Sequence, residues 1–137
     1  MIYLNTDGGA RGNPGPSATG IVITSSNGEI LHNFGTYLGT KTNNEAEYEA
    51  LIEGLNFIVD KNIDKEVVCR LDSELVVKQL NGLYKVKNDR MLILFNKVMS
   101  LKDNLGFVKF SHVLRSSNKM ADQTVNRILD EQEKISR

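Results

Sequence analysis

The sequence predicts an α/β domain built on a mixed β-sheet with helices on both faces. Three strand-like segments come first in the chain, and helical segments then separate the later strands. Consecutive strands joined by tight turns pair antiparallel, whereas strands separated by helices pair parallel. The length of 137 residues fits one domain over 1–137, and 40% hydrophobic with 25% charged residues is ordinary globular composition.

We expect the first three strands at 2–7, 18–24 and 30–38. The stretch between the first two holds both prolines and several glycines, which predicts a tight, irregular connection. Asn27 and Gly28 separate the second strand from the third, and Asn-Gly between two β-rich segments is a strong hairpin signal. The three strands are therefore predicted to form an antiparallel meander.

The rest of the chain alternates helices with two further strands, which gives a five-stranded sheet. Apolar residues recur at helical spacing in the first and last of these helices. The expected elements are a helix at 44–60, a strand at 67–71, helices at 73–80 and 89–101, a strand at 107–113 and a helix from 118 to about 133. A polar tail from about residue 130 is expected to fray.

Charge and composition exclude several functional classes. Seventeen basic and seventeen acidic residues cancel, so binding of nucleic acid through overall positive charge is not indicated, and any phosphate contact must rely on local charge. The longest apolar run, 91–95, is far shorter than the roughly 20 residues that span a bilayer, and we expect no signal peptide and no membrane partner. The single cysteine, Cys69, excludes an internal disulfide and fits a reducing cytoplasm.

Two of the predicted helices each carry one acidic residue on their apolar stripe. Glu47 precedes the apolar positions of the first long helix in steps of three and one. Its neighbours Glu45, Glu49 and Glu53 are expected to face solvent. Asp122 occupies the stripe of the last helix. Both helices should therefore point one carboxylate at the sheet.

The strands supply two more acids at the edge where open α/β sheets bind ligands. Asp7 and Asp72 each follow an apolar strand at its carboxyl end. Four converging carboxylates do not all stay ionised without cations, and oxygen ligands alone favour Mg²⁺ or Mn²⁺. Taken singly, Glu47 could instead support a cap at Asn44, and Asp72 could cap the next helix. The spacing alone therefore indicates a possible metal site in an α/β domain.

Four motifs cover nearly the whole chain in a fixed order. They are DGGARGNPGPSATG, TNNEAEYEAL, DSELVVKQLNG and HVLRSSNKMAD. Together they resemble type 1 ribonuclease H in its compact form, which lacks a basic protrusion. The resemblance implies an endonuclease that hydrolyses the RNA strand of RNA–DNA hybrids with two Mg²⁺ or Mn²⁺ ions, leaving 5′-phosphate and 3′-hydroxyl ends. It also implies a five-stranded mixed sheet and a monomer without an obligate protein partner.

The resemblance assigns roles to individual residues. The metal-binding and catalytic acids fall on Asp7, Glu47, Asp72 and Asp122. The residues expected at the hybrid are Asn13, Asn43 and Asn44 in its minor groove, Thr42 at a phosphate of the DNA strand, and Glu74 at the RNA strand.

The family's auxiliary residue before the last helix has two candidates. His112 stands ten residues before Asp122, which is the family's spacing, but it belongs to a segment that is strand-like throughout. Arg115 lies in the loop that follows. We therefore expect Arg115 in the auxiliary role, with His112 packing in the strand.

Two other classes of protein remain open at this point. A 3′–5′ exonuclease or a transposase core of the same fold would keep clustered acids without the TNNxxE and DSELV motifs. A non-catalytic nucleic-acid-binding module would be expected to have lost at least one acid. Cleavage of hybrids compared with other nucleic acids distinguishes the three classes.

Overall fold

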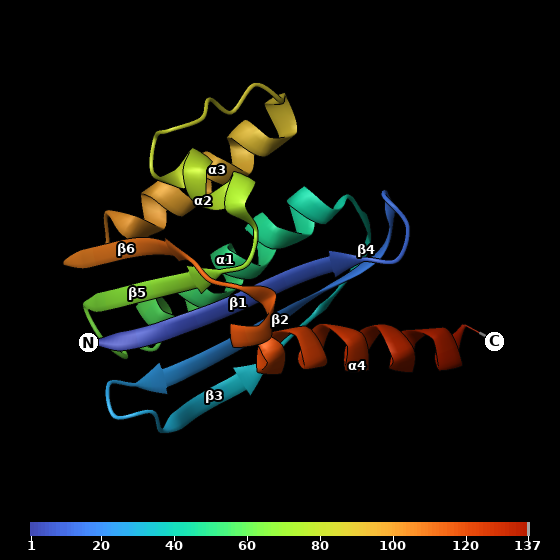
Figure 1. Ribbon diagram of the computed structural model, residues 1–137, viewed down its shortest axis with the longest axis horizontal. Coiled ribbons are helices and arrows are strands. Elements are labelled where there is room, and N and C mark those ends of the chain that lie inside the picture. Colours follow the sequence, from blue (N-terminus) through green and yellow to red (C-terminus); the bar gives the residue numbers. More distant parts are fainter. Residues whose placement is uncertain (137) are drawn as a thin grey trace.

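A mixed six-stranded β-sheet forms the centre of the computed structural model, which describes residues 1–136 (Figure 1). The strands are β1 (Ile2–Ala10), β2 (Gly15–Ser25), β3 (Ile30–Phe34), β4 (Tyr37–Lys41), β5 (Glu66–Leu71) and β6 (Phe107–His112). Their order is β3-β2-β1-β5-β6, and β4 pairs with the first part of β2. β2 is antiparallel to β1, β3 and β4, whereas β5 is parallel to β1 and to β6, as predicted.

The predicted third strand is two strands, which is why the sheet has one strand more than expected. Gly35 and Thr36 interrupt it, and the backbone of Thr36 bonds to Thr19 on β2. A Cβ atom on Gly35 would lie 2.1 Å from the carbonyl oxygen of Thr19. The chain can therefore approach β2 this closely only at a glycine, and β3 ends there.

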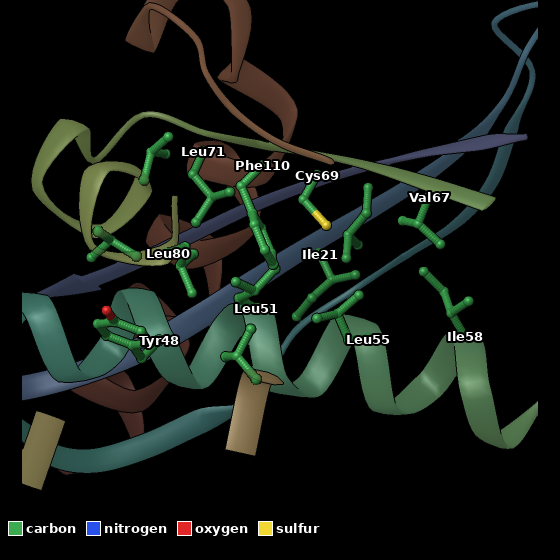
Figure 2. Close-up of a cluster of buried hydrophobic side chains, with 14 of the residues drawn as sticks. Ile21, Tyr48, Leu51, Leu55, Ile58, Val67, Cys69, Leu71, Leu80 and Phe110 are labelled. Carbon is green, nitrogen blue, oxygen red and sulfur yellow. The ribbon is translucent and has the colours of Figure 1, made fainter. Parts of the chain in front are cut away.

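Three helices cover one face of the sheet and one helix covers the other (Figure 1). The helices are α1 (Asn43–Asp60), α2 (Glu74–Leu80), α3 (Asp89–Lys102) and α4 (Lys119–Ile135). The main core lies between the sheet and α1 to α3, where Leu51, Leu55 and Ile58 of α1 are fully buried (Figure 2). A smaller cluster of Ala18, Val125 and Leu129 lies beneath α4.

The last helix extends further than the sequence indicates. It remains helical to Ile135, beyond the residue at which we expected a frayed tail. Arg11, in the loop after β1, lies 2.7 Å from a carboxylate oxygen of both Asp130 and Glu133. These ion pairs join the C-terminal part of α4 to the loop. Within the described chain, no helix is both long and apolar enough to cross a membrane.

Candidate active site

Four acidic side chains from four separate parts of the chain line one pocket of about 410 Å³. They are Asp7 on β1, Glu47 on α1, Asp72 directly after β5, and Asp122 on α4. Carboxylate oxygens of the first three lie within 4.8 Å of one another. The structure therefore brings together the four acids that the sequence singled out.

The local sequence explains why these elements meet. β1 and β5 are parallel with Thr6 opposite Leu71, so Asp7 and Asp72 follow neighbouring positions of the two strands and lie side by side where β5 ends. β1 continues through Gly8 to Ala10 instead of ending at Asp7 as expected. A Cβ atom on Gly8 would lie 2.1 Å from the carbonyl of Ala46, so the glycine allows α1 to pack directly on β1 and to bring Glu47 to the site.

Burial dominates the electrostatics of the cluster. It raises the pKa of Asp7 from 3.8 to about 6, with the charge of Asp72 as the second cause. Burial also raises the pKa of Glu47 well above its ordinary value, followed by the charge of Asp7. Within the described chain, no lysine or arginine forms an ion pair with Asp7, Glu47 or Asp72. Negative charge at the cluster is therefore unfavourable without a cation, and a bound cation would offset it.

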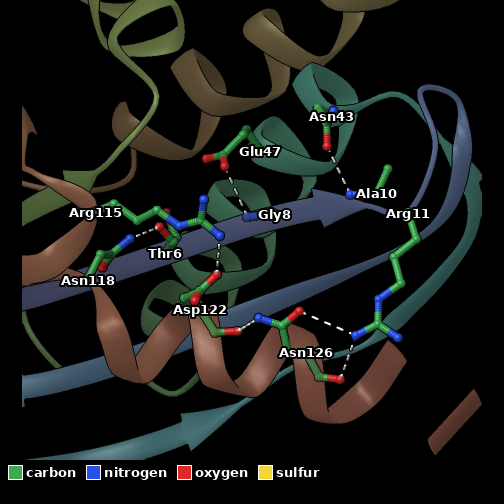
Figure 3. A network of polar contacts seen from close by, with 10 residues as sticks. All are labelled: Thr6, Gly8, Ala10, Arg11, Asn43, Glu47, Arg115, Asn118, Asp122 and Asn126. Carbon is green, nitrogen blue, oxygen red and sulfur yellow. Dashed lines mark hydrogen bonds and ion pairs between the residues drawn. The ribbon is translucent and has the colours of Figure 1, made fainter. Parts of the chain in front are cut away.

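One carboxylate oxygen of the cluster is suited to bind a metal ion. The Gly8 amide donates to Oε1 of Glu47 at 3.3 Å (Figure 3). Oε2 of the same carboxylate is buried and has no hydrogen-bond partner among the described residues. A buried oxygen without a partner is unfavourable unless a cation satisfies it. Oxygen ligands alone, with one of them unpartnered, fit a hard divalent ion such as Mg²⁺ or Mn²⁺.

Asn118 supports the site and was not identified from the sequence. It is 2% exposed, and its Nδ2 donates to the carbonyl of Thr6 at 2.8 Å, next to Asp7 (Figure 3). Its Oδ1 accepts from Asn5 at 3.1 Å. Asn118 therefore fixes the start of α4, and with it Asp122, against β1. A polar residue on the inner stripe four positions before Asp122 was the available signal.

The two auxiliary candidates lie in different surroundings. Arg115 opens a short 3₁₀ turn and lines the pocket, with Nη2 3.4 Å from Oδ1 of Asp122 (Figure 3). His112 lies in β6, as expected, but β6 ends at it and not at residue 113. It pairs with Leu71 and is outside the residues that line the pocket. The expectation that His112 packs in the sheet is wrong, because its side chain is exposed at the end of an edge strand.

The expected hybrid-binding asparagines surround the start of α1. Oδ1 of Asn13 accepts from the backbone amide of Asn43 at 3.0 Å, and Oδ1 of Asn43 accepts from that of Ala10 at 2.9 Å. These bonds hold the loop after β1 against α1. Asn44 is exposed and lines both the acidic pocket and a second pocket beside it. The asparagines thus lie on one rim of the site.

The remaining expectations concern Thr42, the other glutamates of α1, and Glu74. Thr42 caps α1 through a capping box, in which its hydroxyl accepts from the amide of Glu45 and the Glu45 carboxylate accepts from the amide of Thr42. The expectation that Glu45 faces solvent is therefore wrong. It is also wrong for Glu53, which accepts from the hydroxyls of Thr19 and Thr36. Glu74 lines neither pocket and pairs with Lys78 at 2.7 Å.

Comparison with known proteins identifies the family. Residues 5–128 match the family described as Reverse transcriptase-like. The crystal structure of LC11 ribonuclease H1 in complex with an RNA/DNA hybrid is 44% identical, with a TM-score of 0.91 over 96% of this chain and 99% of that one. The chain belongs to the type 1 ribonuclease H family.

Other type 1 ribonucleases H agree in fold and differ in length. The crystal structure of ribonuclease H1 from Halobacterium salinarum has a TM-score of 0.92 at 35% identity, over 95% of this chain and 98% of that one. The curated Ribonuclease HI from that organism is 38% identical over 130 residues. The chain spans 65% of that protein and 35% of a bifunctional protein from Mycobacterium tuberculosis.

Proposed function

We propose that this chain is an endonuclease that hydrolyses the RNA strand of RNA–DNA hybrids. The observation that carries the proposal is the cluster of Asp7, Glu47 and Asp72, beside Asp122, in which one buried Glu47 oxygen has no partner within residues 1–136. The substrate class is supported by the relative that was solved with a hybrid. We expect a monomer without an obligate protein partner, since all four acids come from one chain.

The four acids would hold Mg²⁺ or Mn²⁺, with two ions when substrate is bound. Such ions would supply activation of the attacking water and stabilisation of the leaving 3′ oxygen, which would give 5′-phosphate and 3′-hydroxyl ends. Asn118 keeps Asp122 aligned with β1. Arg115 supplies positive charge at the pocket, and its role is electrostatic because a guanidinium does not release a proton near neutral pH.

The residues around the start of α1 would bind the hybrid. Asn13, Asn43 and Asn44 form the rim that would contact the minor groove, where 2′-hydroxyls distinguish RNA from DNA. Thr42 in the second pocket would lie near a phosphate of the DNA strand. Contact of Glu74 with the RNA strand stays a prediction, since its carboxylate is paired with Lys78.

A panel of five substrates tests the proposal. RNA–DNA hybrid, duplex DNA, duplex RNA and both single strands are incubated with Mg²⁺ and with Mn²⁺ separately, each strand carrying its own label. We expect internal cuts in the RNA strand of the hybrid, and products whose 3′ ends a polymerase extends. A ladder of products that are shortened stepwise from one 3′ end would instead indicate an exonuclease. Binding without cleavage under every condition would indicate a non-catalytic module.

A further inference from the structure

A second pocket, of about 450 Å³, lies directly beside the acidic pocket, and Asn44 lines both. Its lining includes residues from the start of α1, from α2, from the connection between α2 and α3, and from the start of α3. Its polar and basic lining residues include Thr42, Gln79, Lys85, Lys87 and Arg90. The acids of the catalytic cluster do not line it, so its chemistry is separate from that of the metal site.

The charge of this pocket is positive in a chain whose net charge is zero. Lys85, Lys87 and Arg90 contribute three cations, against the single carboxylate of Glu45. That carboxylate accepts from the Thr42 amide, which lowers the pKa of Glu45, and the charge of Arg90 lowers it further. Cations and hydroxyl or amide donors favour an oxyanion. No aromatic side chain lines the pocket among the described residues, so base stacking does not explain it.

Gln79 contributes a donor group whose orientation is fixed by a hydrogen bond from the core. Tyr48 is fully buried in the core (Figure 2), and its hydroxyl donates to Oε1 of Gln79 at 2.7 Å. Burial raises the pKa of Tyr48, so the hydroxyl keeps its proton and remains a donor. With Oε1 engaged by Tyr48, the Nε2 group is the free end of the amide.

That Nε2 group is available to a ligand. Gln79 is 8% exposed and lines the pocket. Within the described chain, Nε2 has no hydrogen-bond acceptor, and it is not among the polar atoms that are sealed from solvent without a partner. The little surface that Gln79 exposes therefore includes this donor.

We propose that Gln79 is a further substrate-binding residue, whose Nε2 donates to a backbone phosphate of the DNA strand, with Tyr48 as its positioning residue. The inference rests on the proposed function and deepens it, because it adds a neutral donor to the pocket in which Thr42 is expected. The cations at the rim attract any phosphate. A fixed amide selects one position for it, which would set the register of the hybrid relative to the metal site.

Steady-state cleavage of a hybrid by Gln79→Met and Tyr48→Phe tests the inference. Gln79→Met should raise KM about tenfold and change kcat less than about twofold, because the lost bond is made before and during cleavage alike. Tyr48→Phe should raise KM by about threefold, because the amide is retained but no longer held. Gln132→Met makes the same change on α4 and should leave KM unaltered. An unchanged KM in Gln79→Met overturns the proposal.

A substrate scan separates a phosphate contact from a purely structural effect. Single linkages of the DNA strand are replaced in turn by neutral methylphosphonates, and KM is measured for each hybrid. For the wild type, replacement of one particular linkage should raise KM. For Gln79→Met, replacement of that same linkage should raise KM less. Equal effects in both proteins at every linkage would contradict the contact. Melting temperatures show whether the variants fold. If Gln79→Met does not fold, Tyr48→Phe still tests the inference, because it removes only one oxygen atom. Failure of the wild type to cut any hybrid would refute the proposed function instead.

Discussion

Asp7 and Glu47 show how a single feature, burial, both destabilises the metal-free site and prepares it for cations. Each carboxylate is removed from water without a basic partner, and burial is the first cause of the raised pKa of both. The unpartnered Oε2 of Glu47 is the clearest sign of this unfavourable state. Residues placed for stability alone would be expected to pair or to be apolar.

The raised pKa of Asp7 predicts how stability depends on pH without metal. The folded protein retains a proton on Asp7 up to about pH 6, whereas the unfolded chain releases it near 3.8. Unfolding is therefore increasingly favoured as pH rises between those values, and above them the loss is constant. In EDTA, melting temperatures of the wild type relative to Asp7→Asn should fall from pH 4 to pH 6. Saturating Mg²⁺ should reverse the fall. A constant difference between the two proteins would contradict the assignment.

The two faces of α1 predict opposite effects of the same substitution. Glu47→Gln should abolish cleavage, because it removes a charged ligand from the pocket. Glu49→Gln, two residues along the helix and away from the cluster, should retain activity close to that of the wild type. Glu45 is unsuitable as the control because it belongs to the capping box. Cleavage rates of both variants are measured at saturating Mg²⁺. Similar losses of activity in both variants would show that the helix face is misassigned.

At the scale of elements, the site depends on how α4 is held against the sheet. Asn118 attaches its first turn to β1, Arg115 pairs with Asp122, and Arg11 joins its C-terminal part to the loop after β1. The buried contact of Asn118 fixes the helix. Arg115 is 78% exposed and free to respond to substrate, since an exposed pair of this kind contributes little to stability.

Arg115 and His112 should therefore differ in turnover rather than in stability. Arg115→Ala should lower kcat by about tenfold, through lost stabilisation of developing charge, with little change in melting temperature. His112→Ala should leave both nearly unchanged, because the side chain is exposed at the end of β6. Rate–pH profiles of the His112 variant should keep every titration that the wild type shows. A large kcat loss in His112→Ala beside an active Arg115→Ala would reverse the assignment.

The sequence predicts the order and pairing of the elements well, because apolar spacing and turn residues are local signals. It also indicates the four acids, since their positions on stripes and at strand ends follow from the same periodicity. The break at Gly35 depends on contact with Thr19, which is distant in the sequence. The burial of Glu45 depends on which residue caps α1, and several residues there are good caps. The Tyr48–Gln79 bond joins two helices and has no local signal.

For the whole molecule, binding of a polyanion must come from local charge, because the net charge is zero. Lys85 and Lys87 in the connection between α2 and α3, with Arg90, provide a positive group beside the site. The connection spans residues 81–88. Binding through so few cations would give modest affinity that depends on each of them.

Salt dependence measures those contacts directly. The slope of log Kd against log salt concentration for hybrid binding should decrease by about one for each phosphate-contacting cation that is removed. Lys85→Ala and Lys87→Ala should each reduce the slope. Lys97→Ala, an exposed position on α3 outside the pocket, is the matched control and should not. If the slopes of all three variants equal the slope of the wild type, this connection does not contact the substrate.

The central claim is that a carboxylate cluster centred on Asp7 cleaves the RNA strand of a hybrid. The most direct test is RNA-strand cleavage by wild type and Asp7→Asn over a Mg²⁺ titration, with melting temperatures of both proteins in EDTA. We predict internal cleavage by the wild type that requires the metal and none by Asp7→Asn. The variant should melt at the same temperature or higher, because the substitution relieves repulsion among the acids. Cleavage by Asp7→Asn at a rate close to that of the wild type would contradict the account.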